Sequence, residues 1–114
     1  MEPKRQLIYL GSSQKDVRKF PNEVQELFAY ALDLALEGGQ HEDAKPLTGF
    51  HGRNVVEVVA DHRGDTYREV YTIRFEEVIY VLHIFQKKSK KGIATPKEDV
   101  ELIKERLKWA EKII

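Results

Sequence analysis

The sequence predicts a single α+β domain, with helices packed in a two-layer arrangement against a small antiparallel sheet in the order β-α-α-β-β-β-α. Three consecutive segments in the second half are rich in β-branched and aromatic residues, and the shortest link between them is a pair of glutamates. Such short links favour antiparallel hairpins over crossovers. Helical patterns precede and follow these segments, as in α+β domains. A length of 114 residues suits one domain, so we expect residues 1–114 to fold together.

The first half is predicted to contain one strand and two helices. Residues 6–10, QLIYL, form a short apolar run that is typical of a strand. A variant of the capping box begins at Ser13 and opens a short helix that ends before Pro21. From Asn22, apolar residues recur at steps of three and four. This spacing predicts an amphipathic helix that ends at the glycines 38–39.

A loop and three strands are predicted next. Segment 40–53 contains glycine, proline and many polar residues, which is typical of a loop. Segments 54–61, 66–75 and 78–86 have the composition of strands. The last of them is apolar on both faces, so we expect it to lie centrally in the sheet with both sides covered.

The C-terminal helix has the clearest start signal in the chain. Thr95 is expected to cap it, Pro96 suits the first helical position, and the Glu98 side chain is placed to reach back to the cap. The apolar stripe of this helix consists of Val100, Ile103, Leu107, Ala110 and Ile114.

Composition excludes several classes of function. The chain has no cysteine, which excludes disulfides and thiolate metal sites and suits a reducing cytoplasm, where we expect the protein to act. No run approaches the roughly 20 apolar residues that span a membrane, so no membrane partner is expected. Phosphate-binding glycine loops and nucleophile-elbow motifs are missing from the sequence. The histidine spacing suits no metal site, and we expect no cofactor.

Basic residues gather in one place although 19 basic and 19 acidic residues cancel over the whole chain. Lys87, Lys88, Lys90 and Lys91 follow the last predicted strand, and no acidic residue interrupts them. Lysines bind nucleic acids by neutralising phosphates. This cluster therefore favours contact with a nucleic-acid backbone. The alternative is a solvated loop whose charges keep it soluble and protect a strand edge.

Two arginines in the predicted strand 66–75 are candidates for binding phosphate. Because side chains alternate along a strand, Arg68 and Arg74 are expected on the same face. Arginine binds phosphate through two N–H groups and stabilises the charge that develops on the phosphate. The alternative is an arginine that lies along the sheet surface or pairs with Glu57 or Glu69.

Histidines are candidates for proton transfer, since imidazole both takes and gives a proton near neutral pH. His51, in the predicted loop between two glycines, is the best placed of the four. His83 lies inside the last predicted strand and is more typical of a histidine that is hydrogen-bonded within a sheet.

Three stretches carry a resemblance to a known family. AKPLTGFHGRNVVEV, TYREVYTIRF and YVLHIFQKKSKKGIATPKEDVELIKERL resemble the phage-derived branch of the RelE/HigB toxin family, part of the RelE/ParE superfamily, and the resemblance extends from about Gln6 to Lys112. It implies a RelE-like fold and a toxin that enters the ribosome and cuts mRNA without a metal, by attack of the ribose 2′-hydroxyl on the adjacent phosphorus. It also implies an antitoxin partner, often a helix-turn-helix protein encoded beside the toxin.

The resemblance also implies roles for residues that match the family's motifs. Arg68, in YREVY, would stabilise charge on the phosphate in the transition state. Lys87 and Lys88, in FQKKS, would hold the scissile or neighbouring phosphates, although strand alternation lets only one of them point with the active face. His51 would transfer a proton. The residues expected to bind the RNA backbone more generally are Lys45, Arg53, Arg74, Lys90 and Lys91.

Two departures from the family pattern leave other functions open. The chain has no tyrosine or histidine after His83, where some relatives carry a catalytic one, and its net charge is zero although toxins of this class are usually basic. The alternatives are a non-catalytic RNA-binding module, a phage accessory protein that keeps the toxin fold, and a relative that acts on DNA gyrase.

Overall fold

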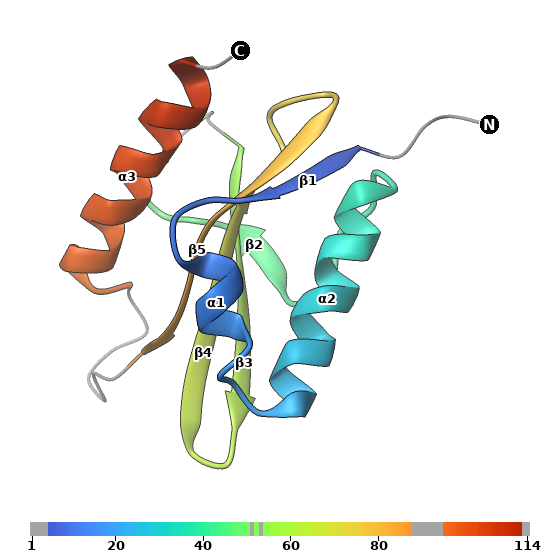
Figure 1. Cartoon of the computed structure of the whole chain (residues 1–114), viewed down its shortest axis with the longest axis vertical. Helices are drawn as coiled ribbons and strands as arrows, with labels where there is room; N and C mark the ends of the chain where they lie inside the picture. The colour runs from blue at the N-terminus through green and yellow to red at the C-terminus, as the bar shows by residue number, and fades with distance from the viewer. Residues whose placement is uncertain (1–4, 51, 53, 88–94, 113–114) are drawn as a thin grey trace.

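The computed structural model describes residues 5–50, 52, 54–87 and 95–112, and within them it has the predicted α+β class. A mixed sheet of five strands has the order β1-β5-β4-β3-β2, with three helices packed against it (Figure 1). The elements are β1 (Gln6–Tyr9), α1 (Ser13–Val17), α2 (Asn22–Leu36), β2 (Ala44–Pro46), β3 (Val55–His62), β4 (Asp65–Thr72), β5 (Val78–Lys87) and α3 (Lys97–Lys112).

The sheet departs from the prediction at its two edges. β1 pairs with β5 in parallel, so the sheet is mixed rather than antiparallel throughout. The physical reason is that the chain reaches β5 only after two helices and three other strands, and this long connection allows a crossover. At the other edge, the predicted loop 40–53 contains the short strand β2, which pairs antiparallel with β3.

Helices cover both faces of the sheet, so the expected two-layer arrangement was wrong in this respect. Apolar residues of α2, with Val17 of α1, pack on one face, and those of α3 pack on the other. Figure 1 shows α2 and α3 on opposite sides of the strands. The central strand β5 contributes to both cores, which confirms that it is covered on both sides. Its nearly continuous apolar sequence is the local cause.

A bulge in β5 fixes which side chains face α3. The register between β4 and β5 shifts at Val70 and Tyr71, so Leu82 is an extra residue on β5. Leu82 packs in the core beside α3, and the next residue, His83, hydrogen-bonds to Asp99 of α3. Both therefore point to the same face, which a regular strand would not allow. Phe85 and Lys87 follow at alternate positions on that face.

Two local structures position the ends of the elements around this face. The β3–β4 hairpin turns at Arg63 and Gly64, whose φ angles are 49° and 86°, as a tight two-residue turn requires. At α3, the amide of Val100 bonds to the carbonyl of Pro96, so the helix starts at Lys97 rather than at the proline. The Thr95 hydroxyl, which was expected to cap the helix, bonds to side chains of the sheet.

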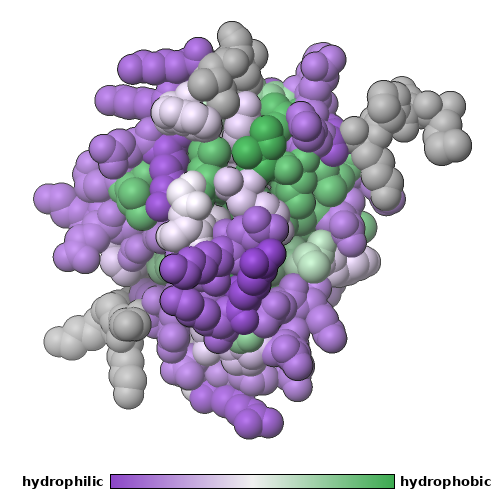
Figure 2. Space-filling model, viewed as in Figure 1, coloured by the Kyte–Doolittle hydropathy of each residue, from purple (hydrophilic) through white to green (hydrophobic). Residues whose placement is uncertain are grey.

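Figure 2 shows hydrophobic residues in the upper half of the face in view, near β1, and hydrophilic residues over α1. β1 is an edge strand whose hydrophobic residues are only partly buried, which accounts for part of this exposure. In the part of the chain that the structure describes, no helix is both long and apolar enough to cross a membrane.

Candidate functional site

Four neighbouring strands place charged side chains on the face of the sheet that α3 partly covers. Lys45 of β2 lies directly opposite Glu57 of β3 in the register, and direct partners point to the same side. Arg68 lies opposite Phe85, and two residues further along β5 is Lys87, so these two cations share that side. The sequence separates these residues, and the pairing of β2, β3, β4 and β5 brings them together.

The four charged side chains line one open groove of about 1350 Å³. The groove runs over the ends of β2–β5, the β3–β4 hairpin and the start of α3. Its charged and polar lining consists of Glu42, Asp43, Lys45, Thr48, Glu57, Asp61, Asp65, Thr66, Arg68, Gln86, Lys87 and Thr95. Three of the cations predicted from the sequence, Lys45, Arg68 and Lys87, are therefore found in one concave site.

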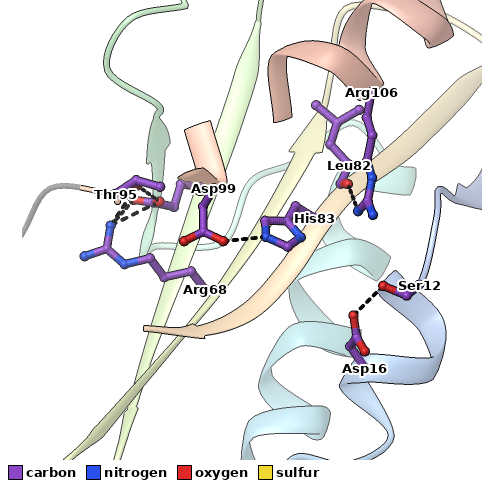
Figure 3. A network of polar contacts seen from close by, with 9 residues as sticks. Ser12, Asp16, Arg68, Leu82, His83, Thr95, Asp99 and Arg106 are labelled. Atoms are coloured by element: carbon purple, nitrogen blue, oxygen red, sulfur yellow. Dashed lines mark hydrogen bonds and ion pairs between the residues drawn. The ribbon is translucent and has the colours of Figure 1, made fainter. Parts of the chain in front are cut away.

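A cluster of Glu57, Arg68 and Thr95 forms the floor of this groove. Nη1 of Arg68 lies 3.1 Å from Oε1 and 3.2 Å from Oε2 of Glu57, and it also donates to Oγ1 of Thr95 at 3.0 Å. The Thr95 hydroxyl in turn donates to Oε2 of Glu57 at 2.7 Å. Figure 3 shows Arg68 and Thr95 turned toward each other from different elements. The alternative pairing of Arg68 with Glu57 is thus the one that the structure contains.

Burial of the charged side chains in this cluster costs free energy unless the charges are paired. Glu57 on β3 and Arg68 on β4 are each only 5% exposed, and the residues beside them on both strands are buried as well. A buried charge is tolerated when an opposite charge and hydrogen bonds replace the lost water. The carboxylate obtains these from the guanidinium and the hydroxyl together, so the three residues are held as a unit.

The two lysines differ in their surroundings. Lys87 is buried to 9% exposure at the end of β5, beside the groove floor, whereas Lys45 is exposed on the edge strand β2. Lys87 lies on the face of Arg68, as strand alternation from Phe85 requires. Lys88 lies outside the described residues, and so do the other predicted site residues His51, Arg53, Lys90 and Lys91.

Two further candidates lie outside the groove. Arg74 follows the end of β4 and forms an ion pair with Glu111 of α3, with its guanidinium 5.7 Å from the Phe75 ring centre. Arg74 lies beyond the end of β4 at Thr72, so the alternation of side chains along that strand does not place it with Arg68.

His83 is held inside the structure and is not part of the groove lining. Its Nε2 lies 2.8 Å from Oδ1 of Asp99, and its ring stacks on Phe85 at 4.5 Å between ring centres (Figure 3). Burial lowers its pKa below the ordinary value for histidine, while the hydrogen bond to Asp99 acts in the opposite direction. This is the arrangement expected of a histidine bonded within a sheet, and it joins β5 to the first turn of α3.

Sequence reasoning did not propose Glu57 and Thr95 as site residues. Glu57 is the single acidic residue in the run VVEVVA, and such a charge inside a buried strand is a usable signal. Thr95 was interpreted only as a helix cap, whereas its hydroxyl bonds to Glu57 and Arg68. Within the described residues, no three histidine, aspartate or glutamate side chains lie close enough to hold a metal ion.

Comparison with known proteins places the chain in a family. A search of the curated proteins gave no match. The family model described as "Phage derived protein Gp49-like (DUF891)" matches residues 15–108, a range that includes Lys45, Glu57, Arg68, Lys87 and Thr95. Because this match covers most of the chain, from α1 to the last turns of α3, the protein belongs to the Gp49-like family of phage-derived proteins.

Proposed function

We propose that the protein is the toxin of a toxin–antitoxin system and acts as a ribosome-dependent mRNA endoribonuclease. Membership of the Gp49-like family, which is associated with RelE/HigB-type toxins, supports the first part. The observation that supports the second part is the convergence of Lys45, Arg68 and Lys87 on one groove beside a buried carboxylate. Cations bind and stabilise a phosphate, and a carboxylate is able to accept a proton.

The reaction that suits these groups needs no metal. The ribose 2′-oxygen attacks the adjacent phosphorus, the O2′–P bond forms and the P–O5′ bond breaks, which leaves a 2′,3′-cyclic phosphate and a 5′-hydroxyl. Arg68 stabilises the charge on the phosphate oxygens, and Lys87 holds the same or a neighbouring phosphate. Lys45, at the exposed edge, binds the RNA backbone further along.

Glu57 is the described residue best placed to accept the 2′-hydroxyl proton. Its carboxylate lies within hydrogen-bond distance of Arg68, so a phosphate on that guanidinium brings the ribose close to it. The leaving 5′-oxygen takes a proton from water, and Glu57 then returns its proton to solvent. His51, the proton-transfer residue expected from the sequence, remains a prediction.

Groove charge favours docking through the ribosome over capture of free RNA. Glu42, Asp43, Asp61 and Asp65 lie along the groove besides Glu57, so among the lining residues that the structure describes acids outnumber the cations Lys45, Arg68 and Lys87. Such a groove attracts a polyanion weakly by itself. A ribosome that presents mRNA in a fixed position removes the need for strong non-specific attraction, and an antitoxin that fills the groove would block the reaction.

The test is expression in bacteria, with cuts in translated mRNA mapped by primer extension. The parent protein should arrest growth, and Lys87→Gln should lower cleavage by roughly 100-fold because a phosphate contact is lost. Lys104→Gln, on the exposed face of α3, is the matched control and should cleave as the parent does. A folded parent that neither arrests growth nor cuts mRNA contradicts the proposal. RNA binding without cleavage would then favour a non-catalytic module, and inhibited supercoiling would favour gyrase as the target.

A further inference from the structure

Thr95 has an unusual position for a residue beside a helix start. It precedes Pro96, whose carbonyl accepts the first hydrogen bond of α3, and its side chain is turned to the sheet. The hydroxyl donates to Oε2 of Glu57 and accepts from Nη1 of Arg68, so it contacts both members of the buried ion pair (Figure 3).

The hydrogen bonds around Nη1 of Arg68 are crowded. This nitrogen carries two hydrogens, and three oxygens lie within hydrogen-bond distance of it, two from Glu57 and one from Thr95. A phosphate oxygen that approaches this edge of the guanidinium must therefore replace one of them. The carboxylate of Glu57 is itself an oxyanion and occupies the place where a phosphate would bind.

The two oxygens of Glu57 are held differently. Oε1 has Arg68 as its described partner, at 3.1 Å. Oε2 has Arg68 at 3.2 Å and, more closely, the Thr95 hydroxyl at 2.7 Å. If the guanidinium turns to a phosphate, Oε1 loses its donor and Oε2 keeps one. The carboxylate then remains in place with one oxygen available.

We propose that Thr95 is a positioning residue: it holds Oε2 of Glu57 while the substrate phosphate replaces the carboxylate on Arg68, so that Oε1 accepts the proton of the 2′-hydroxyl. This rests on the proposed ribonuclease function. Without a phosphate on Arg68, Oε1 of Glu57 is paired with the guanidinium. Binding of the substrate phosphate releases Oε1 from this pair, so that it is able to accept a proton. The proton moves from the 2′-oxygen to Oε1 as the O2′–P bond forms and the P–O5′ bond breaks, and water protonates the 5′-oxygen.

The first experiment compares Thr95→Val with Thr95→Ser in a translation reaction with purified ribosomes, where kcat and KM for cleavage are measured. Valine keeps the shape and removes the hydroxyl, so kcat should fall by roughly 10- to 100-fold with KM nearly unchanged, whereas serine should restore the parent rate.

Thr72→Val is the matched control for a buried hydroxyl. Thr72 lies on β4, away from the groove lining, and its oxygen accepts from the amide of Tyr80. This variant loses a hydrogen bond of the sheet and should keep the parent kcat and KM. Cleavage by Thr95→Val with the parent's kcat would overturn the role of Thr95 and leave the ribonuclease proposal intact. Absence of cleavage by the folded parent would overturn both.

A second measurement on the unaltered protein covers the case in which Thr95→Val does not fold. The probe is a dinucleotide whose 5′ ribose carries a 2′-O-methyl group, which binds as substrate and is not cleaved. NMR should show the guanidinium signals of Arg68 and the carboxyl carbon signal of Glu57 moving together as the dinucleotide is added. Movement of the Arg68 signals with the Glu57 carboxyl unchanged contradicts the exchange.

Discussion

At the scale of single residues, Arg68 and Glu57 depend on each other for their burial. Both side chains are almost fully covered, and each supplies the charge that the other needs. Arg68→Ala should lower the free energy of unfolding by about 3–5 kcal/mol, because it leaves a buried carboxylate without its countercharge. Urea denaturation followed by circular dichroism measures this loss.

The matched variant is the double replacement Glu57→Leu with Arg68→Met. Removal of both charges for apolar groups of similar size is often neutral or stabilising, so this protein should unfold within about 1 kcal/mol of the parent or at higher urea. It should also be inactive. A double variant as unstable as Arg68→Ala would show that the loss comes from packing rather than from the unpaired charge.

Glu69, the next residue along β4, presents the opposite situation. It is fully buried on the α2 face, and neither carboxyl oxygen has a hydrogen-bond partner among the described residues. Burial raises its pKa well above the ordinary value. The folded protein therefore binds a proton that the unfolded chain releases near its ordinary pKa of about 4.3. Stability from this group is complete below that pH and declines as the pH rises toward the folded-state pKa.

Glu69→Gln should accordingly flatten the pH dependence of stability. Between about pH 5 and 8, the free energy of unfolding of the parent should fall more steeply with pH than that of the variant, because the amide does not titrate. Denaturation midpoints in urea at several pH values measure the two slopes. Glu26→Gln, on the exposed side of α2, should retain the parent slope. Equal slopes for the parent and Glu69→Gln would contradict the assignment.

Sequence motifs predicted some of the site residues, and others were identified only from their neighbours in the folded structure. Arg68 and Lys87 were predicted from the motifs YREVY and FQKKS, and both line the groove. Glu57 became a candidate only when strand pairing placed it diagonally across from Arg68. Thr95 has a sequence context that predicts a cap, and only the sheet that lies beside it shows that its hydroxyl is used elsewhere.

At the scale of elements, the side chain of Arg106 on α3 bonds to β5 and lies against the turn after β1. Arg106 of α3 donates to the carbonyl of Leu82 at the bulge, 2.8 Å away. Gly11, with a φ of 56°, lies so near that an added Cβ would be 2.3 Å from Nη2 of Arg106. The glycine is therefore needed both for its backbone conformation and for the space that it leaves to the guanidinium.

Gly11→Ala should destabilise the protein more than Gly38→Ala does. Gly38, at the end of α2, also has a positive φ of 88°, and an added Cβ there meets nothing within 4 Å. Both variants incur the backbone cost of about 1 kcal/mol, and only the first displaces Arg106 from Leu82, which adds roughly 1 kcal/mol. Thermal unfolding measures the difference. In an Arg106→Met background the two alanine variants should become equal, and a persistent difference would assign the cost to other contacts.

Periodicity predicted the long helices α2 and α3, and composition predicted the strands β3, β4 and β5, whereas neither signal identified β2 or the bulge in β5. β2 has three residues and ends in a proline, so nothing in its composition separates it from the loop around it. The bulge in β5 lies inside an apolar run, where alternation is invisible. The parallel pairing of β1 depends on where the chain returns after its helices, which is a property of the tertiary fold.

At the scale of the whole molecule, the net charge is zero, yet positive and negative side chains occupy different parts of the groove. Arg68 and Lys87 lie at its floor and along β5, whereas Glu42 and Asp65 are exposed at its margin. Exposed acids at that position repel a phosphate backbone before it reaches the floor. The arrangement disfavours free RNA, and a partner that delivers the phosphate in a fixed position overcomes the repulsion.

The double variant Glu42→Gln with Asp65→Asn tests this division. It should bind free single-stranded RNA several-fold more tightly than the parent at low salt, and the gain should shrink at high salt, where the Debye length is about 3 Å at 1 M. Fluorescence anisotropy of a labelled RNA measures both. The control, Glu26→Gln with Glu101→Gln, changes the net charge equally on exposed helix faces away from the groove and should bind as the parent does. Equal gains in both double variants would mean that total charge, rather than its place in the groove, governs attraction to RNA.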